Sequence, residues 1–147
     1  MRIIHHKENC IGCKACQQAC QDVHHFPPKM KIMEIIEKDS GKEDALKVEY
    51  QMHTCRQCIR AACIAECMEG AISRSAEGVV VIDEALCIGC GRCEEVCPEH
   101  AILLRRTNRG KKATKCDACI TYNKQNEETA GIPACVNACP LNCILVG

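Results

Sequence analysis

The stretch that decides the fold is Cys87–Pro98, CIGCGRCEEVCP, which places four cysteines within eleven residues and follows the last with a proline. The spacing is C-x2-C-x2-C-x3-C, so Cys87, Cys90 and Cys93 share one short loop and Cys97 comes a turn later. Cysteines this close together are typical of metal sites. The first question is whether the four thiols hold one metal centre or two.

The same pattern recurs along the chain, and it accounts for sixteen of the seventeen cysteines. Every group begins C-x2-C and ends C-x3-C, and only the gap between these halves varies. The groups are Cys10, Cys13, Cys16, Cys20; Cys55, Cys58, Cys63, Cys67; Cys87, Cys90, Cys93, Cys97; and Cys116, Cys119, Cys135, Cys139. The last cysteine, Cys143, stands where other groups carry Ala71 and Ala101, which predicts a small buried thiol rather than a further ligand.

The amino-acid composition excludes some explanations for the high cysteine content. The 147 residues include no tryptophan, one phenylalanine and two tyrosines, so few large side chains can fill a core. An odd cysteine total and an opening, MRIIHHKENC, without an apolar leader argue against a secreted disulfide scaffold, and we expect a soluble, cytoplasmic protein. Basic and acidic residues balance at 19 each, which gives nucleic-acid binding no support.

Between the cysteine groups the chain reads as short strands. We expect a hairpin from strands at 31–36 and 46–50 around a polar turn at 38–42, and further strands at 78–82 and 101–105. The segments 15–20 and 94–97 predict short helical turns, and 120–131 predicts an exposed polar loop. The predicted fold class is α+β, with small strands and short helices built around the cysteines.

The spacing favours iron–sulfur clusters over zinc. Structural zinc usually takes two ligand pairs separated by a spacer, which the first and third groups lack. In the run C-x2-C-x2-C-x3-C-P the fourth cysteine ligates the other cluster of a pair, so Cys87, Cys90 and Cys93 belong to one site and Cys97 to its neighbour. Sixteen cysteines at four per cubane predict four [4Fe–4S] clusters with no open iron, which suits electron transfer and not catalysis.

The order of the four motifs resembles the four-cluster ferredoxin-like electron-transfer subunits that accompany molybdenum or tungsten pterin oxidoreductases, formate dehydrogenases, hydrogenases and carbon monoxide dehydrogenase. The likeness spans nearly the whole chain, from Cys10 through the segments 77–90 and 115–117 to Cys139. It implies two interleaved bacterial-type ferredoxin units in one domain, 1–147. The inner unit would cover about 51–106 and the outer unit 1–30 plus 107–147, with the hairpin 31–50 inserted.

The resemblance also implies which cysteines share a cluster. The first set is Cys10, Cys13, Cys16 and Cys139, and the second is Cys116, Cys119, Cys135 and Cys20. The third set is Cys55, Cys58, Cys63 and Cys97, and the fourth is Cys87, Cys90, Cys93 and Cys67. Met68 and Gln21 depart from the proline that commonly follows the fourth cysteine, although no ligand is lost.

The expected function is that of a non-catalytic subunit that relays electrons between a larger catalytic redox subunit and a second electron carrier. A pterin-dependent aldehyde oxidoreductase, a formate dehydrogenase or a hydrogenase would fit the catalytic role, and we expect anaerobic metabolism. With no membrane-anchoring helix before its end at Gly147, the chain favours a small soluble subunit. A freely diffusing polyferredoxin and a structural zinc-binding interaction module are the alternatives.

Other residues receive simpler interpretations. The six histidines are expected at the surface or beside ligands, with His53 the best neighbour of a cluster. The pairs 105–106 and 111–112 predict a solvated basic face. Backbone amides near Gly12, Gly89 and Gly91 are expected to donate to sulfur, and Ile32, Ile35 and Ile36 are weak candidates for an exposed apolar patch.

Overall fold

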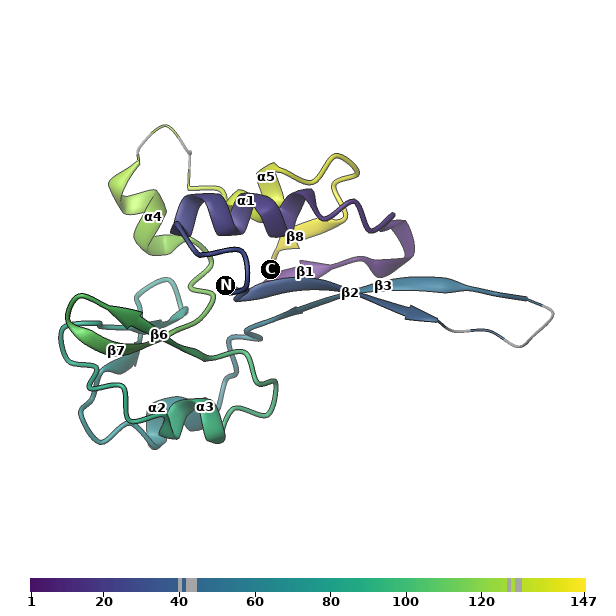
Figure 1. Ribbon diagram of the computed structural model, residues 1–147. Helices are drawn as coiled ribbons and strands as arrows, with labels where there is room; N and C mark the ends of the chain where they lie inside the picture. The colour runs from purple at the N-terminus through teal and green to yellow at the C-terminus, as the bar shows by residue number, and fades with distance from the viewer. Residues whose placement is uncertain (40, 42–44, 127, 129–130) are drawn as a thin grey trace. The chain divides into compact units, whose positions relative to one another are not determined.

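The computed structural model describes residues 1–39, 41, 45–126, 128 and 131–147 of the chain (Figure 1). These residues form short helices and two-stranded sheets, which confirms the predicted α+β class with a ferredoxin-like arrangement of small elements. The chain divides into two compact units. Among the helices of the described segments, none has the length and apolar character that crossing a bilayer requires.

The first unit comprises Met1–Arg2 and Thr54–Ala118. Two antiparallel hairpins build it: β4 (Ile72–Arg74) pairs with β5 (Val80–Ile82), and β6 (Leu103–Thr107) pairs with β7 (Gly110–Thr114). Each of the two single-turn helices, α2 (Ala62–Ala65) and α3 (Arg92–Glu95), contains the third cysteine of its group, and the two helices pack together.

The core of the first unit is made of small aliphatic side chains and thiols. Ile72, Val80, Ile102 and Ala113 are almost wholly buried. Five cysteines of the second and third groups belong to this core or pack against it: Cys63, Cys67, Cys87, Cys93 and Cys97. A core of this kind buries little apolar surface for its length, because it lacks aromatic side chains. Cysteine sulfur therefore makes up much of the interior.

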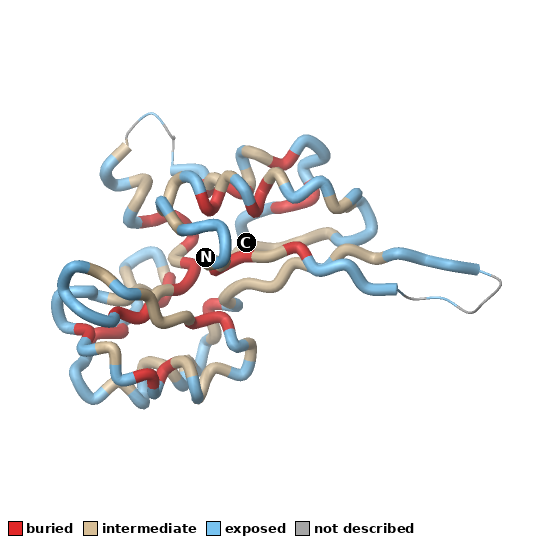
Figure 2. The backbone as a smooth tube through the Cα atoms, in the orientation of Figure 1, coloured by how far each residue is buried: buried red, intermediate tan, exposed pale blue. Residues whose placement is uncertain are grey.

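The second unit comprises Ile3–His53 and Cys119–Gly147. Its sheets pair β1 (Ile3–His5) with β8 (Ile144–Val146) and β2 (Met33–Asp39) with β3 (Val48–Thr54). The helices of this unit are η1 (Lys7–Asn9, a 3-10 turn), α1 (Ala15–His24), α4 (Ile120–Gln125) and α5 (Ala134–Asn137). Helix α1 packs against α5 and β2, and the far end of β2 is exposed (Figure 2).

Several elements differ from the sequence prediction. The helix expected as a short turn at 15–20 continues to His24, and the segment 120–125, expected as loop, is the helix α4 with Ile120 buried. The predicted strands at 31–36 and 46–50 begin two residues later in the structure, and the turn at 38–42 lies partly outside the described residues. Strands β1 and β8 have only three residues each and β7 is mostly polar, so none of the three shows an alternation from which it could be predicted.

The longer α1 explains why Gln21 replaces the usual proline. Gln21 is the seventh residue of α1, where a proline would remove a helical hydrogen bond and clash with the preceding turn. Its buried side chain instead donates to the carbonyls of Pro27, Pro28 and Met30, at 3.4, 3.2 and 3.4 Å. Gln21 thus fixes the loop that leads from α1 to β2.

Candidate iron–sulfur centres

Two cavities in the first unit are lined by cysteines. One, of about 380 Å³, is bordered by Cys55, Cys58, Cys63 and Cys97. The other, of about 450 Å³, is bordered by Cys67, Cys87, Cys90 and Cys93. In each case three thiols of one group meet the last thiol of the other group, so residues far apart in the sequence converge on one cavity.

A cavity of about 300 Å³ in the second unit is lined by five cysteines, four from the predicted first set and one more. Cys10, Cys13 and Cys16 come from the loop before α1 and its first turn, and Cys139 follows α5. The fifth is Cys143, which is only 3% exposed, as its equivalence with two alanines predicts. Its Sγ lies 3.3 Å from that of Cys139.

The remaining predicted set, Cys20, Cys116, Cys119 and Cys135, consists of four buried thiols. Cys116 belongs to the first unit and the other three belong to the second. Within the second unit, Cys20 lies on α1 and Cys135 on α5, the two helices that pack together. The ligand pairing of this set stays a prediction from the family resemblance.

Tight turns bring backbone amides to the sulfurs. Gly12 and Gly89, in the two C-I-G-C loops, have φ values of +69° and +72°, and a Cβ added to Gly89 would collide with the backbone of Lys111. The Gly12 amide donates to Cys10 Sγ at 3.5 Å, which confirms the predicted role of that amide. Glycine allows both the left-handed turn and the close approach of neighbouring chain.

Three further amides donate to sulfur. Those of Ala101, Ala113 and Ala118 each lie 3.4 Å from a cysteine Sγ. Their acceptors are, in that order, Cys97, Cys87 and Cys116. With Cys10 included, each predicted ligand set contains at least one cysteine whose sulfur accepts a hydrogen bond from a backbone amide. Such hydrogen bonds favour the negatively charged sulfur and are one of the means by which a protein adjusts cluster potential.

The thiols are gathered in surroundings that disfavour free thiolates. Burial, with a smaller contribution from neighbouring cysteines, raises the pKa of Cys16 and of Cys93 to about 11. Burial likewise raises the pKa of Cys63 and Cys116. Several thiolates around one cavity are stable only with a cation among them, because both burial and mutual repulsion oppose their charge. This donor set fits a cationic iron–sulfur core.

Two buried lysines lie beside these cysteines. The Nζ of Lys112 donates to the carbonyl of Cys87, and the Nζ of Lys115 donates to the carbonyls of Val80 and Cys116. Both side chains are less than a tenth exposed, so the predicted solvated basic face is wrong for Lys112. A buried ammonium requires such acceptors, and it adds positive charge near the cysteine loops.

Gln57, which sequence reasoning missed, fixes one cysteine loop. Its buried side chain donates to the carbonyl of Cys116 at 2.8 Å and accepts from the amide of Val80 at 2.8 Å. It lies between Cys55 and Cys58 with a φ of +52°, a conformation that few non-glycine residues adopt. The only sign of this role in the sequence is a glutamine inside a C-x2-C motif. Cysteine spacing alone does not show whether such a glutamine is buried or lies at the surface.

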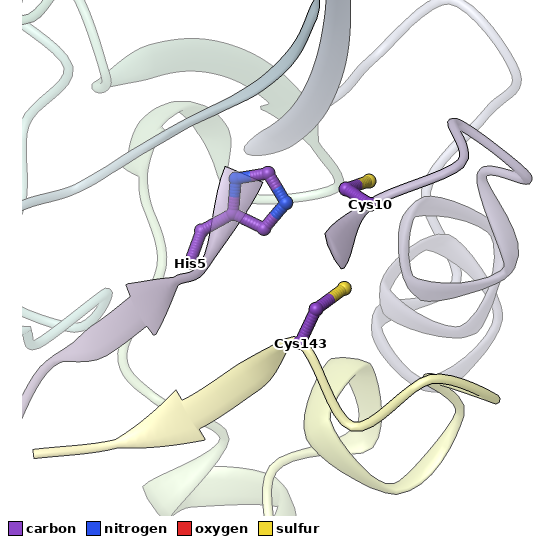
Figure 3. Close-up of side chains that lie close together, drawn as sticks. All are labelled: His5, Cys10 and Cys143. Atoms are coloured by element: carbon purple, nitrogen blue, oxygen red, sulfur yellow. The ribbon is translucent and has the colours of Figure 1, made fainter. Parts of the chain in front are cut away.

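Two histidines other than His53 lie near cysteine sulfur. His24 Nε2 is 3.8 Å from Cys119 Sγ. His5, Cys10 and Cys143 face one another in the second unit (Figure 3), and their ligand atoms all lie within 4.8 Å of each other. His5 Nδ1 accepts the Met52 amide at 3.2 Å, which leaves the proton on Nε2. The Nε2 atom is buried and has no hydrogen-bond partner among the described residues.

The expected apolar patch is wrong in two of its three residues. Ile32 and Ile35 are 4% and 3% exposed, and of the three only Ile36 reaches the surface. Ile35 lies on β2, which packs against α1, and its amide donates to Gln17 of that helix at 3.2 Å. Alternation along β2 places Met33 and Ile35 on the buried face, and the exposed part of the strand is mostly charged.

These cavities and loops are those of an iron–sulfur protein, and this protein belongs to the family of 4Fe-4S dicluster domains, whose pattern matches residues 46–147. Among curated relatives, Protein NrfC of Escherichia coli (strain K12) is 33% identical over 147 residues, which cover 99% of this chain and 64% of NrfC. One of the chains of the anaerobic dimethyl sulfoxide reductase of the same organism is 34% identical over 146 residues, covering 94% of this chain and 68% of that protein.

A third relative, the Protein NrfC homolog of Haemophilus influenzae (strain ATCC 51907 / DSM 11121 / KW20 / Rd), is 35% identical over 147 residues, covering 99% of this chain and 63% of that protein. The chain therefore spans a little under two thirds of the length of the NrfC proteins. Membership of the family confirms the predicted resemblance, and it selects [4Fe–4S] clusters over zinc as the cofactors.

Proposed function

We propose that the chain is the electron-transfer subunit of an oxidoreductase complex, passing single electrons between a larger catalytic subunit and a second redox partner. The observation that carries this proposal is the convergence of complete cysteine sets on separate cavities. Bound [4Fe–4S] clusters supply one-electron redox chemistry. Four thiolates per set would occupy every iron, which leaves no position for a substrate.

The proposal assigns sixteen cysteines to four clusters. Cys10, Cys13, Cys16 and Cys139 hold the first, and Cys20, Cys116, Cys119 and Cys135 the second. Cys55, Cys58, Cys63 and Cys97 hold the third, and Cys67, Cys87, Cys90 and Cys93 the fourth. Three of these sets each border one of the cavities described above, which supports the assignment.

Groups outside the ligand sets adjust the potentials of the clusters. Amides such as that of Ala113 donate to ligand sulfur, and Lys112 and Lys115 place buried positive charge beside two cysteine loops. Both effects favour the more negative, reduced state of a nearby centre. We therefore expect the chain itself to raise the potentials of its first-unit centres relative to exposed clusters.

The proposed catalytic partner is a molybdenum or tungsten pterin enzyme, such as an aldehyde oxidoreductase or a formate dehydrogenase, or a hydrogenase. The relative from anaerobic dimethyl sulfoxide reductase is, by its name, one chain of a reductase, which supports a subunit role over a freely diffusing polyferredoxin. The cytoplasmic location stays a prediction from the sequence.

The test is anaerobic purification of the chain from its native host, followed by measurement of iron, acid-labile sulfide and co-purifying subunits. We expect about sixteen iron and sixteen sulfide per chain and a larger pterin-containing or hydrogenase subunit identified by mass. Zinc without sulfide would refute the electron-transfer role. Four clusters without any stable partner would instead support a diffusible polyferredoxin.

A further inference from the structure

The cavity bordered by Cys10, Cys13 and Cys16 differs from the two cavities of the first unit because it has one thiol too many. Cys139 and Cys143 both line it, and both are buried. At the matching position in the cavity of the fourth set stands Ala71, which is 2% exposed and has no sulfur. In the last three groups a small buried residue stands four positions after the last cysteine, and of Ala71, Ala101 and Cys143 only Cys143 can bind metal; the first group has His24 at that position.

The distance between the two sulfurs allows either one to reach the same iron. Metal–thiolate bonds are about 2.3 Å long, so two sulfurs on one tetrahedral iron lie about 3.8 Å apart. The Sγ atoms of Cys139 and Cys143 are 3.3 Å apart. An iron within bonding distance of one sulfur is therefore also within reach of the other after only a small side-chain movement.

The backbone holds Cys143 in this position. Its carbonyl accepts the His6 amide at 2.8 Å, and the next residue, Ile144, pairs with His5 in the β1–β8 sheet. The Cys143 sulfur faces Cys10 and His5, with all three ligand atoms within 4.8 Å of each other (Figure 3). The thiol is therefore directed at the cavity by the sheet.

We propose that Cys143 is an alternative ligand for the iron that Cys139 binds, so that this centre has five thiols for four iron positions. The proposal rests on the ligand set assigned under the proposed function. If Cys143 took over, its thiol proton would pass to the departing Cys139 sulfur 3.3 Å away, the bond between iron and Cys143 would form as the bond to Cys139 broke, and no electron would be transferred.

The places of the two thiols in the repeat indicate which one binds first. Cys139 stands at the end of the C-x3-C half, where every group has a cysteine, whereas Cys143 stands at the position that Ala71 and Ala101 occupy in two other groups. Cys139 is thus the expected ligand, and Cys143 is the thiol held in reserve.

The test compares alanine variants of the intact chain, purified anaerobically, by iron content and by the EPR signal of a [3Fe–4S] centre. Cys139→Ala should keep about sixteen iron atoms per chain and show no new signal, and Cys143→Ala should do the same. The matched control is Cys67→Ala, which has Ala71 at the reserve position. It should fall to about fifteen or twelve iron atoms, as should the double variant C139A/C143A.

Equal iron loss in Cys139→Ala and Cys67→Ala would overturn the proposal while leaving the four-cluster assignment intact. Full iron in Cys67→Ala would instead refute the ligand assignment itself. Loss of iron in Cys143→Ala alone would also overturn the proposal, because Cys143 would then be obligatory. If Cys139→Ala does not fold, C67A/A71C provides the second test: it should regain the iron that C67A lacks, and failure to regain it would refute the geometry.

Discussion

Replacing Gln57 by leucine should loosen the first unit without removing any cysteine. The leucine keeps the volume of the buried side chain but removes its hydrogen bonds to Val80 and Cys116. The Val80 amide then has no partner, which costs about 1–3 kcal/mol, while the Cys116 carbonyl keeps the Lys115 ammonium at 2.9 Å and loses about 0.5–1.5 kcal/mol. Local opening should become easier by about 1.5–4.5 kcal/mol.

The assay is the rate at which visible cluster absorbance bleaches in dilute guanidinium under anaerobic conditions, because local opening exposes cluster ligands before global unfolding. At about 1.4 kcal/mol per factor of ten, the rate should rise roughly 10- to 1,600-fold. The control is Gln18→Leu, which removes an exposed side-chain hydrogen bond to Asp22 and should change the rate by only about twofold. Bleaching of the Gln57 variant at the wild-type rate would refute the bridging role.

Three further perturbations test the geometry of the centres. Gly89→Ala should speed bleaching at least about tenfold more than Gly70→Ala, since both strain a left-handed turn but only Gly89 also faces neighbouring backbone; equal rates would contradict this. His5→Leu should lower one cluster potential by about 20–40 mV in an EPR-monitored titration. The reason is that the Nε2–H of His5 faces sulfur in the wild-type protein and stabilises the reduced state. An unchanged potential would exclude that contact. Reconstitution of iron-stripped protein should keep accelerating above pH 9, because burial raises the pKa of Cys16 and Cys93 to about 11 and only the thiolate binds; a plateau at pH 9 would show ordinary thiols.

The sequence predicted the α+β class because short apolar strands and helical turns alternate with the cysteine groups, and it predicted those groups because cysteine spacing is a strong local signal. The sequence did not predict that the side chains of Gln57, Gln21 and Lys112 are buried. Each is polar, and its hydrogen-bond partners come from other segments of the chain. Periodicity assigns such residues to the surface, where most of them lie in other proteins. Tertiary hydrogen bonding therefore decided their burial.

The same limit applies to β1 and β8. Each has only three residues, and neither shows an alternating pattern, because their stability comes from pairing with each other across the length of the chain. His5 was predicted only as one of six histidines, and its contact with Cys143 depends on that pairing. The sequence of either strand alone does not indicate that it pairs with a strand at the other end of the chain.

The pairing of β1 with β8 also sets an order of events during synthesis on the ribosome. Apart from its first two residues, the first unit is one continuous segment, so it can fold and receive its metal as soon as Ala118 has emerged. If Cys139 completes the proposed ligand set, Cys10, Cys13 and Cys16 are translated earlier but must wait for it, which at about 5–20 residues per second takes on the order of ten seconds. During that interval they are exposed nascent thiols, open to oxidation or to capture by assembly factors.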